Sequence, residues 1–300
     1  MAPRLDLSGV LIPCVTPFAQ GSGELDLGGF RGNLERFVAD PVRGIVVGGS
    51  TGEAVFLERE ERVALLRVAR EVVAEDRLLV AGAGAESTRG TLRLINDAAS
   101  VGADAVLVQP PAFYRGAMTP EALREHYEKV ADASPLPVIL YQVPLRMSTL
   151  EFPTGLVAEL SRHPAIIGIK DSRGDLSLLA DLVEACSPGF QVLVGSGSRF
   201  YGALEVGAVG GILGVANLVP AHCAEIARAF GQERMAEAGR VQEEVAPLHD
   251  GIVTALGVPG VKAALDHLGL AGGNPRSPLR PLSKKARSRV QALLGAAGAT

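Results

Sequence analysis

The sequence predicts a (β/α)8 TIM barrel with additional C-terminal helices. Eight short apolar runs, rich in β-branched residues, alternate with longer amphipathic stretches, and this repetition is typical of that fold. Each run is almost continuously apolar, as expected for parallel strands that are buried on both faces. A doubly wound sheet is the rival, but Pro13-Cys14-Val15-Thr16-Pro17 stands where that fold carries its glycine-rich fingerprint.

The predicted strands and helices follow one another along the chain. The stretch 58–74 places apolar side chains near one side and Arg and Glu on the other. The stretch 119–133 opens with Thr-Pro-Glu, an N-cap followed by proline at the first helical position. We expect strands at 9–18, 44–49, 78–83, 104–111, 136–143, 165–170, 190–195 and 209–215, and helices between them at 58–74, 119–133, 175–186 and 220–230.

The alternation of strands and helices ends near residue 230. Helical stretches follow at 232–256, 258–268 and 283–294, punctuated by glycine and proline, with no strand between them. This tail is too short for a core of its own. We therefore expect residues 1–230 to form the barrel and residues 231–300 to form a helical extension that packs on the barrel or builds a subunit contact.

Composition and charge exclude several classes of protein. With 300 residues, 47% of them hydrophobic and 21% charged, the chain can bury a sizeable core, which excludes disorder. The net charge of −4 supplies no basic face for nucleic acid. No apolar run reaches the ~18 residues of a membrane span, and the N-terminus lacks an apolar signal core. We expect a cytoplasmic protein with neither nucleic acid nor membrane as a partner.

The cysteines and histidines give no sign of a metal site. The three cysteines are far apart and predict no disulfide framework. The histidines form no H-x-x-x-H or H-x-H pair, so no metal is expected. These residues are Cys14, Cys186 and Cys223, and His126, His163, His222, His249 and His267.

Lys170 is the first candidate for chemistry. It ends the apolar run 165–170, and active sites of such barrels lie at the carboxyl ends of the strands. Five of the 29 basic residues are lysines and the other 24 are arginines, so a lysine in this place is unusual. Burial disfavours an ammonium ion, and a neutral amine is nucleophilic toward carbonyl groups. The alternative is a lysine whose head only reaches water at the strand end.

A glycine-rich turn follows the second predicted strand, in Gly48-Gly49-Ser50-Thr51-Gly52-Glu53. Backbone N–H groups at a helix start favour an anion, and Ser50 and Thr51 add hydroxyl donors. The lysine of a nucleotide P-loop is missing, so a small carboxylate is a better guest. The alternative is a capped turn without a ligand.

Further candidates lie at the ends of later strands. Tyr141 closes the fifth strand, where its phenol could move a proton or satisfy a core hydrogen bond. Arg146 follows it and could hold a carboxylate or lie at the surface. Ile212, on the eighth strand, is a candidate for substrate binding. The glycine loops 195–198 and 207–211 are weighed as a phosphate site, with Arg199 as the nearby cation.

Three of these motifs together carry a resemblance to a known family. Gly49-Ser50-Thr51-Gly52-Glu53, Tyr141-x-Val143-Pro144-x-Arg146 and Ile169-Lys170-Asp171-Ser172 resemble the dihydrodipicolinate synthase / N-acetylneuraminate lyase family of pyruvate-dependent Schiff-base aldolases. The resemblance extends over residues 9–282. It implies a (β/α)8 barrel with C-terminal helices, a homotetramer built as a dimer of dimers, and no metal or organic cofactor.

The resemblance also implies a role for each matching residue. Lys170 matches the Schiff-base lysine and Tyr141 the phenol that shuttles a proton, assisted by Ser50. Ser50 and Thr51 match the hydroxyl pair that binds the carboxylate of a 2-oxo acid, next to Gly49. Arg146 matches an arginine that receives the second substrate in the synthases.

Departures from the synthase pattern bear on the substrate. The synthases carry a second tyrosine after strand four, where this chain has Phe113, with Tyr114 displaced by one residue. The acidic pair after strand seven is replaced by Ser196-Gly197. Segments such as 78–88 and 113–116 look closest to the 4-hydroxy-2-oxoglutarate aldolases, although those usually lack the arginine at Arg146.

The sequence therefore predicts a Schiff-base aldolase that uses pyruvate and an aldehyde, with 4-hydroxy-2-oxoglutarate as the leading substrate. The first alternative is 4-hydroxy-tetrahydrodipicolinate synthase, which joins pyruvate to aspartate semialdehyde. A sugar-acid dehydratase or aldolase of the same family is another. The non-enzymatic alternative is a sensor that binds a 2-oxo acid without turnover.

Overall fold

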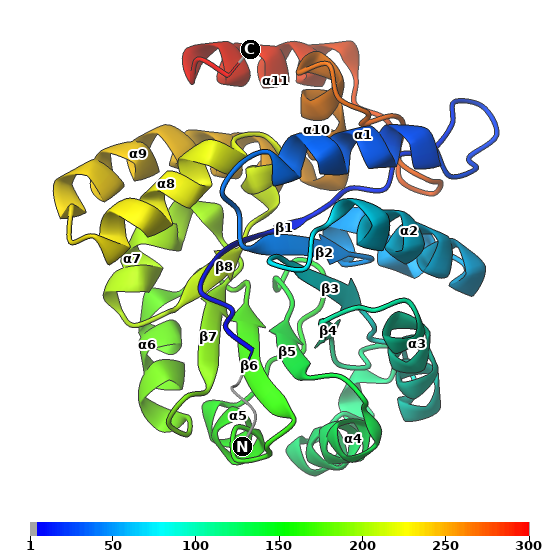
Figure 1. The fold of residues 1–300 in the computed structure, drawn as a ribbon, viewed down its shortest axis with the longest axis vertical. Coiled ribbons are helices and arrows are strands. Elements are labelled where there is room, and N and C mark those ends of the chain that lie inside the picture. The colour runs from blue at the N-terminus through cyan, green and yellow to red at the C-terminus, as the bar shows by residue number, and fades with distance from the viewer. Residues whose placement is uncertain (1–4, 300) are drawn as a thin grey trace.

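A computed structural model describes residues 5–299 and shows a closed barrel of eight parallel strands surrounded by helices (Figure 1). Each strand pairs with the next along the chain, and β1 closes the ring by pairing with β8. The predicted (β/α)8 fold class is therefore confirmed. The expectation about the N-terminus falls partly on residues 1–4, which lie outside the described residues.

Seven of the eight strands lie within the predicted apolar runs, several of which extend beyond the paired residues, and β6 continues one residue past its run, to Asp171. Cys14 N still donates to Val46 O (3.0 Å), but the chain then leaves the sheet, so the first predicted strand was too long. The strands are β1 (Gly9–Pro13), β2 (Gly44–Val47), β3 (Leu78–Gly82), β4 (Ala105–Val108), β5 (Val138–Gln142), β6 (Ile166–Asp171), β7 (Gln191–Val194) and β8 (Gly210–Ile212).

Helices cover the outside of this ring. The four predicted between strands are present, at α2 (Arg59–Val72), α4 (Pro120–Ala133), α6 (Leu176–Ala185) and α8 (Pro220–Gly231). The structure adds four that the sequence analysis did not delimit, α1 (Leu27–Val38), α3 (Thr88–Ser100), α5 (Thr154–Leu160) and α7 (Phe200–Glu205). In α4, Thr119 accepts from Ala122 N and Pro120 begins the helix, as predicted.

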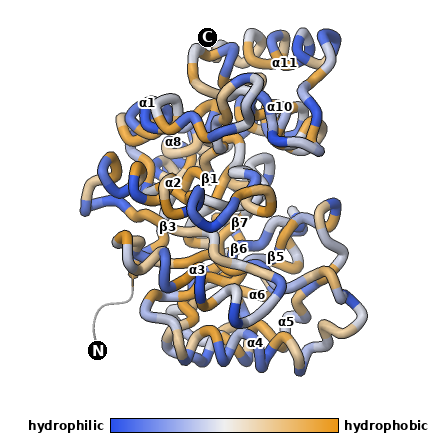
Figure 2. The backbone as a smooth tube through the Cα atoms, turned by 90° about the vertical axis from the view of Figure 1, so that its right-hand side faces the viewer, coloured by the Kyte–Doolittle hydropathy of each residue, from blue (hydrophilic) through white to orange (hydrophobic). Residues whose placement is uncertain are grey.

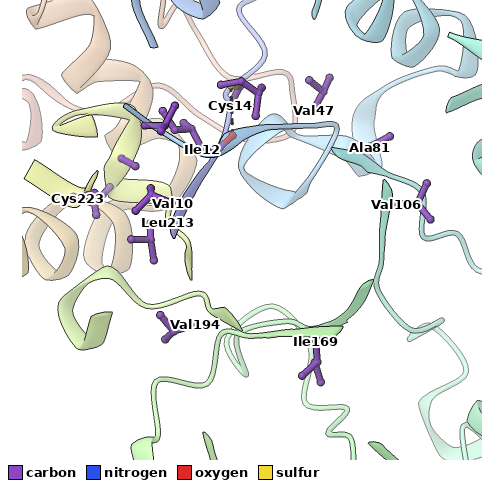
Figure 3. Packing of buried hydrophobic residues seen from close by; sticks show 14 of the residues in the cluster. Val10, Ile12, Cys14, Val47, Ala81, Val106, Ile169, Val194, Leu213 and Cys223 are labelled. Carbon is purple, nitrogen blue, oxygen red and sulfur yellow. Dashed lines mark hydrogen bonds between the residues drawn. The ribbon is translucent and has the colours of Figure 1, made fainter. Parts of the chain in front are cut away.

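Side chains of each strand alternate between the barrel interior and the helices. Val10, Val47, Val106 and Ile169 are among those that point out of the ring (Figure 3). A separate buried cluster, which includes Leu11, Val46, Val80, Leu107, Ile139 and Tyr141, fills the interior. Because both faces of every strand are buried, the strands are largely hydrophobic along their length, while hydrophilic residues gather on the outer helices (Figure 2).

The chain after the barrel differs from the prediction in one important way. The predicted helical stretch 232–256 is helical from residue 235 onward but is not one regular helix, because α9 (Met235–Leu248) gives way to a wider π-helix, η6 (His249–Thr254). Pro247 lies just before this change and lacks the N–H that a regular α-helix would use there. Two helices follow, α10 (Ala255–His267), which kinks at Gly257, and α11 (Lys284–Ala296).

The extension packs on the outside of the barrel, where α9 lies against α8. The last helix, α11, lies against α10 at the top of Figure 1. The division of the chain at residue 230 stays a prediction. Within residues 5–299, no helix has the length and apolar character needed to cross a membrane.

Candidate active site

Lys170 and Tyr141 lie next to each other inside the barrel. They are register partners on the paired strands β6 and β5, and the Lys170 Nζ atom is 4.3 Å from the centre of the Tyr141 ring. Their neighbours Ile169 and Leu140 belong to the outer core, so the alternation along each strand turns Lys170 and Tyr141 inward. Both are buried, with 6% and 3% of their surface exposed. The structure thus brings these two predicted site residues together at the ends of neighbouring strands.

A pocket of about 260 Å³ opens above this pair. Six of the seven predicted site residues line it, coming from five different parts of the chain. These are Ser50, Thr51, Tyr141, Arg146, Lys170 and Ile212.

The seventh, Gly49, supports the turn instead of lining the pocket. Its carbonyl accepts the N–H groups of Gly52 (3.0 Å) and Ala54 (3.3 Å), which closes the turn. Gly52 must be glycine because a Cβ would lie 2.9 Å from Cys14 O. Ser50 and Thr51 therefore face the pocket from a tightly built turn. Neither hydroxyl bonds another residue of the 5–299 range, which leaves both available to a carboxylate.

Glu53, at the end of this turn, is tied to the C-terminal extension by a buried ion pair. Its Oε1 is 2.5 Å from Lys262 Nζ, and neither side chain is exposed to solvent. Lys262 also donates to Asn274 O (3.0 Å), and Arg276 N donates to Glu53 Oε2 (2.8 Å). Glu53 has a left-handed backbone (φ 57°), an unusual conformation for a residue with a side chain. Its buried contacts compensate for that cost and hold the turn that carries Ser50 and Thr51 against α10.

Replacing Lys262 by methionine should destabilise the fold strongly, because it leaves the Glu53 carboxylate buried without its cation. Loss of one partner of a buried pair costs about 3–5 kcal/mol. For a chain of this size we expect the melting temperature to fall by roughly 5–8 °C. The double variant Glu53→Gln/Lys262→Met is the control, since it buries no charge and should recover most of the loss. Equal melting temperatures for Lys262→Met and the parent would show that the pair contributes nothing.

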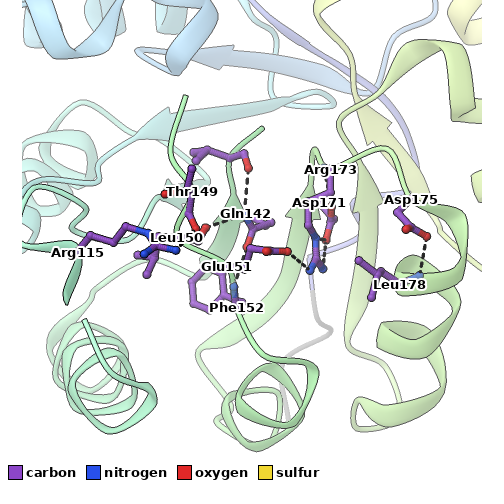
Figure 4. A network of polar contacts seen from close by, with 11 residues as sticks. Arg115, Gln142, Thr149, Leu150, Glu151, Phe152, Asp171, Arg173, Asp175 and Leu178 are labelled. Carbon is purple, nitrogen blue, oxygen red and sulfur yellow. Dashed lines mark hydrogen bonds and ion pairs between the residues drawn. The ribbon is translucent and has the colours of Figure 1, made fainter. Parts of the chain in front are cut away.

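The loop that carries Arg146 is held by the end of β5. Gln142 donates to Val143 O (3.0 Å) and Leu150 O (3.1 Å), and accepts from Phe152 N (2.8 Å; Figure 4). This fixes both ends of the segment that presents Arg146, whose side chain donates weakly to Val253 O (3.5 Å).

The charged groups around the pocket favour an anion. Arg173 also lines the pocket, but it is neutralised by Asp171, whose Oδ2 lies 2.5 Å from its Nη2 (Figure 4). Within residues 5–299, neither Arg146 nor Arg199 forms a salt bridge, and both line the pocket. Asp250 also lines the pocket and contributes a negative charge, which opposes the binding of an anion.

The π-helix η6 supplies site residues that sequence reasoning missed. His249, Asp250, Val253 and Thr254 all line the pocket. The sequence pattern predicts an ordinary helix for this segment, and the spacing of the histidines bears only on metal binding. Pro247 inside a helical pattern was the available signal of irregular geometry.

Ser172, the last residue of the third motif, also lines the pocket, and no role was predicted for it. The two late glycine loops separate in the structure. Gly195, Ser196 and Ser198 border the pocket, whereas Gly207 comes before β8 and so lies toward the opposite end of the barrel.

Phe113 and Tyr114 lie outside this pocket. Their rings pack edge to face, with centres 5.1 Å apart, and they are 79% and 74% exposed. The N–H groups of Ala112 and Phe113 donate to Glu86 Oε2, which fixes the base of their loop. That Tyr114 replaces the interface tyrosine of the synthases stays a prediction.

Neither a metal-binding cluster nor a disulfide is present among residues 5–299. In the 5–299 range, no three or more His, Cys, Asp or Glu side chains cluster in a way that could hold a metal ion. The three cysteines are free thiols. Burial raises the pKa of Cys186 to about 11 and that of Cys223 to about 12.

A buried lysine beside a tyrosine, with two hydroxyls and cationic side chains around one barrel pocket, defines a lyase that works through a Schiff base. The sequence profile of the Dihydrodipicolinate synthetase family matches residues 6–297. The chain belongs to this family of pyruvate-dependent Schiff-base aldolases, as its motifs predicted.

Relatives of two activities match nearly the whole chain. "Probable 4-hydroxy-2-oxoglutarate aldolase, mitochondrial" of Emericella nidulans is 36% identical and covers 97% of this chain and 96% of its own. The 4-hydroxy-tetrahydrodipicolinate synthase of Nitratidesulfovibrio vulgaris is 33% identical, covering 98% and 99%. The chloride-inhibited dihydrodipicolinate synthase of Acinetobacter baumannii, solved with pyruvate, has a TM-score of 0.93 at 30% identity and covers 98% and 100%.

Proposed function

We propose that the enzyme cleaves 4-hydroxy-2-oxoglutarate into pyruvate and glyoxylate. The observation that carries this proposal is the pair of arginines, Arg146 and Arg199, that line the Lys170 pocket without an acidic partner among residues 5–299. The substrate has a carboxylate at each end. Ser50 and Thr51 would bind the carboxylate next to the ketone, and the arginines would bind the distal one.

The proposed reaction uses Lys170 as nucleophile and Tyr141 as base. The Lys170 amine adds to the C2 ketone and loses water to form a protonated imine. Tyr141, assisted by Ser50, removes the proton of the C4 hydroxyl, and the C3–C4 bond breaks as glyoxylate leaves. The bonding electrons flow into the imine and leave an enamine. Protonation of C3 and addition of water then release pyruvate and regenerate the amine.

The main alternative is 4-hydroxy-tetrahydrodipicolinate synthase, the activity named for the Nitratidesulfovibrio vulgaris relative. One feature of the pocket favours it: Asp250 lines the wall and could pair with the ammonium group of aspartate semialdehyde. Of seven similar relatives, one is named as a 4-hydroxy-2-oxoglutarate aldolase and six are named as 4-hydroxy-tetrahydrodipicolinate synthases. A sugar-acid dehydratase or aldolase stays a further alternative, without a specific observation in its favour.

A comparison of two reactions separates these activities. Release of pyruvate from 4-hydroxy-2-oxoglutarate is measured next to consumption of pyruvate with aspartate semialdehyde, at equal enzyme concentration. We expect the first kcat/KM to exceed the second by at least about tenfold, a difference of ~1.4 kcal/mol in transition-state binding. The reverse ratio would replace the aldolase proposal by the synthase.

Replacing Arg146 by alanine tests the contact with the distal carboxylate. A hydrogen bond between charged groups contributes about 1.5–3 kcal/mol, so we expect KM for 4-hydroxy-2-oxoglutarate to rise roughly 10- to 100-fold. KM for 4-hydroxy-2-oxopentanoate, which has a methyl group in place of that carboxylate, should change much less. Arg124→Ala is the matched control, because Arg124 lies on the surface of α4, where it pairs with Glu159. Equal effects of Arg146→Ala on both substrates would place Arg146 outside the binding site.

A homotetramer and a cytoplasmic location are further parts of this proposal. Exposed apolar side chains support a subunit contact beside the active-site mouth: Val55, Phe113, Tyr114, Leu145 and Met147. Val55 and Met147 also line a second hollow of about 600 Å³, which Ser50 borders. Sedimentation of the purified enzyme would give the number of subunits.

A further inference from the structure

His249 comes from η6 in the C-terminal extension and reaches the pocket wall opposite the strand ends of the barrel. It is buried, with 5% of its surface exposed. Nothing in the Schiff-base chemistry uses it. Among the described residues, both hydrogen bonds of the His249 side chain are with the loop that follows β7, where Ser196 and Gly197 replace the acidic pair of the synthases.

The hydrogen bonds of His249 define its tautomer. The backbone N–H of Gly197 donates to Nδ1 (3.2 Å), so Nδ1 carries no proton. The single proton of the neutral ring is then on Nε2, which lies 3.4 Å from the Ser196 hydroxyl oxygen. Burial lowers the pKa of His249 to about 4; nearby Arg146 acts in the same direction and Asp250 opposes it. The ring is therefore neutral at pH 7.

The loop is built to bring these groups together. A Cβ on Gly197 would lie 3.0 Å from His249 Nδ1 and 2.5 Å from a Val215 methyl carbon, so only glycine allows this approach. Gln242 of α9 holds the loop from the other side, donating to Gly197 O (3.0 Å) and accepting from Tyr201 N (2.8 Å). The extension thus fixes the loop at several points.

The geometry points to His249 as a positioning residue for the second substrate. Because its Nε2–H donates to Ser196 Oγ, the Ser196 hydroxyl keeps its own hydrogen for an acceptor in the pocket. We propose that this acceptor is the distal carboxylate of a 4-hydroxy-2-oxo dicarboxylic acid, bound together with Arg146. Ser198 Oγ, 3.3 Å from Ser196 Oγ, is the competing acceptor, and a carboxylate is the stronger one. This inference rests on the proposed function.

The test compares four variants on two substrates: Ser196→Ala, His249→Phe, His249→Gln and the double variant Ser196→Ala/His249→Phe. The kcat and KM values are measured for 4-hydroxy-2-oxoglutarate and 4-hydroxy-2-oxopentanoate. We expect His249→Phe to raise KM for the dicarboxylate about tenfold more than for the monocarboxylate, the scale of one hydrogen bond to a charged group. The amide of His249→Gln can accept and donate, so it should recover most of the loss. His222→Phe, at a surface histidine, is the matched control.

The double variant shows whether His249 acts through Ser196. If it does, the double variant should be no worse than Ser196→Ala alone, to within about twofold. Additive losses, or equal losses on both substrates, would overturn the inference. Should His249→Phe fail to fold, the smaller apolar variant His249→Leu, alone and combined with Ser196→Ala, gives the same comparison. A parent enzyme that forms the pyruvate imine but does not cleave 4-hydroxy-2-oxoglutarate would instead overturn the proposed function, and this inference with it.

Discussion

Replacing Lys170 by alanine is expected to lower kcat by at least about a thousandfold, the scale seen when a nucleophile is removed. Lys170 is the only lysine that lines the pocket within the described chain. Lys262 is fully buried in its pair with Glu53, and Lys129 lies on α4, so neither can take its place. Without Lys170 the substrate ketone has no amine to form an imine, and the electrons of the breaking bond have no acceptor.

Borohydride reduction in the presence of pyruvate gives this experiment a second readout. In the parent, reduction of the imine should leave one pyruvate-derived group on the peptide that contains Lys170, measured by mass. Lys170→Ala should show no adduct, with a melting temperature close to that of the parent. Lys129→Ala, which removes a surface lysine paired with Glu125, should behave as the parent in both assays. If the turnover of Lys170→Ala stayed within tenfold of that of the parent, the assignment of Lys170 as the Schiff-base lysine would be contradicted.

The barrel could be predicted from the sequence because both faces of each strand are buried. Val10 and Leu11 are neighbours in β1, yet one packs toward the helices and the other into the interior, and both must be apolar. Such runs mark the strands without revealing where pairing stops. The end of β1 at Pro13 depends on the neighbouring strand, and no local pattern shows it.

The part of the site on the strand ends could be predicted for a similar reason. Lys170 and Tyr141 end apolar runs, and parallel strands bring their carboxyl ends to one side of a barrel. His249 could not be found this way, because it reaches the pocket only through the π-helix that follows α9. The ion-pair partner of Glu53 could not be predicted from the sequence either. Lys262 is 209 residues away in sequence, and only the packing of α10 brings the two side chains together.

Replacing Tyr141 by phenylalanine is expected to separate imine formation from cleavage of the C–C bond. The ring should stay in place beside Lys170, because the change removes one oxygen atom and leaves the packing around the ring intact. Loss of a general base or acid lowers turnover by about 100- to 10,000-fold. We expect a fall of kcat in this range for cleavage of 4-hydroxy-2-oxoglutarate, whereas the borohydride adduct with pyruvate still forms, more slowly.

Tyr201→Phe is the matched control for this variant, since Tyr201 packs against Phe230 and does not line the pocket. It removes the same phenol hydroxyl elsewhere in the fold and should leave both turnover and the adduct unchanged. Two results would contradict the role of Tyr141. Unchanged turnover of Tyr141→Phe would mean that another group moves the proton of the C4 hydroxyl. Complete loss of the adduct would mean that Tyr141 is needed to form the imine itself, so that the defect arises before the C–C bond breaks.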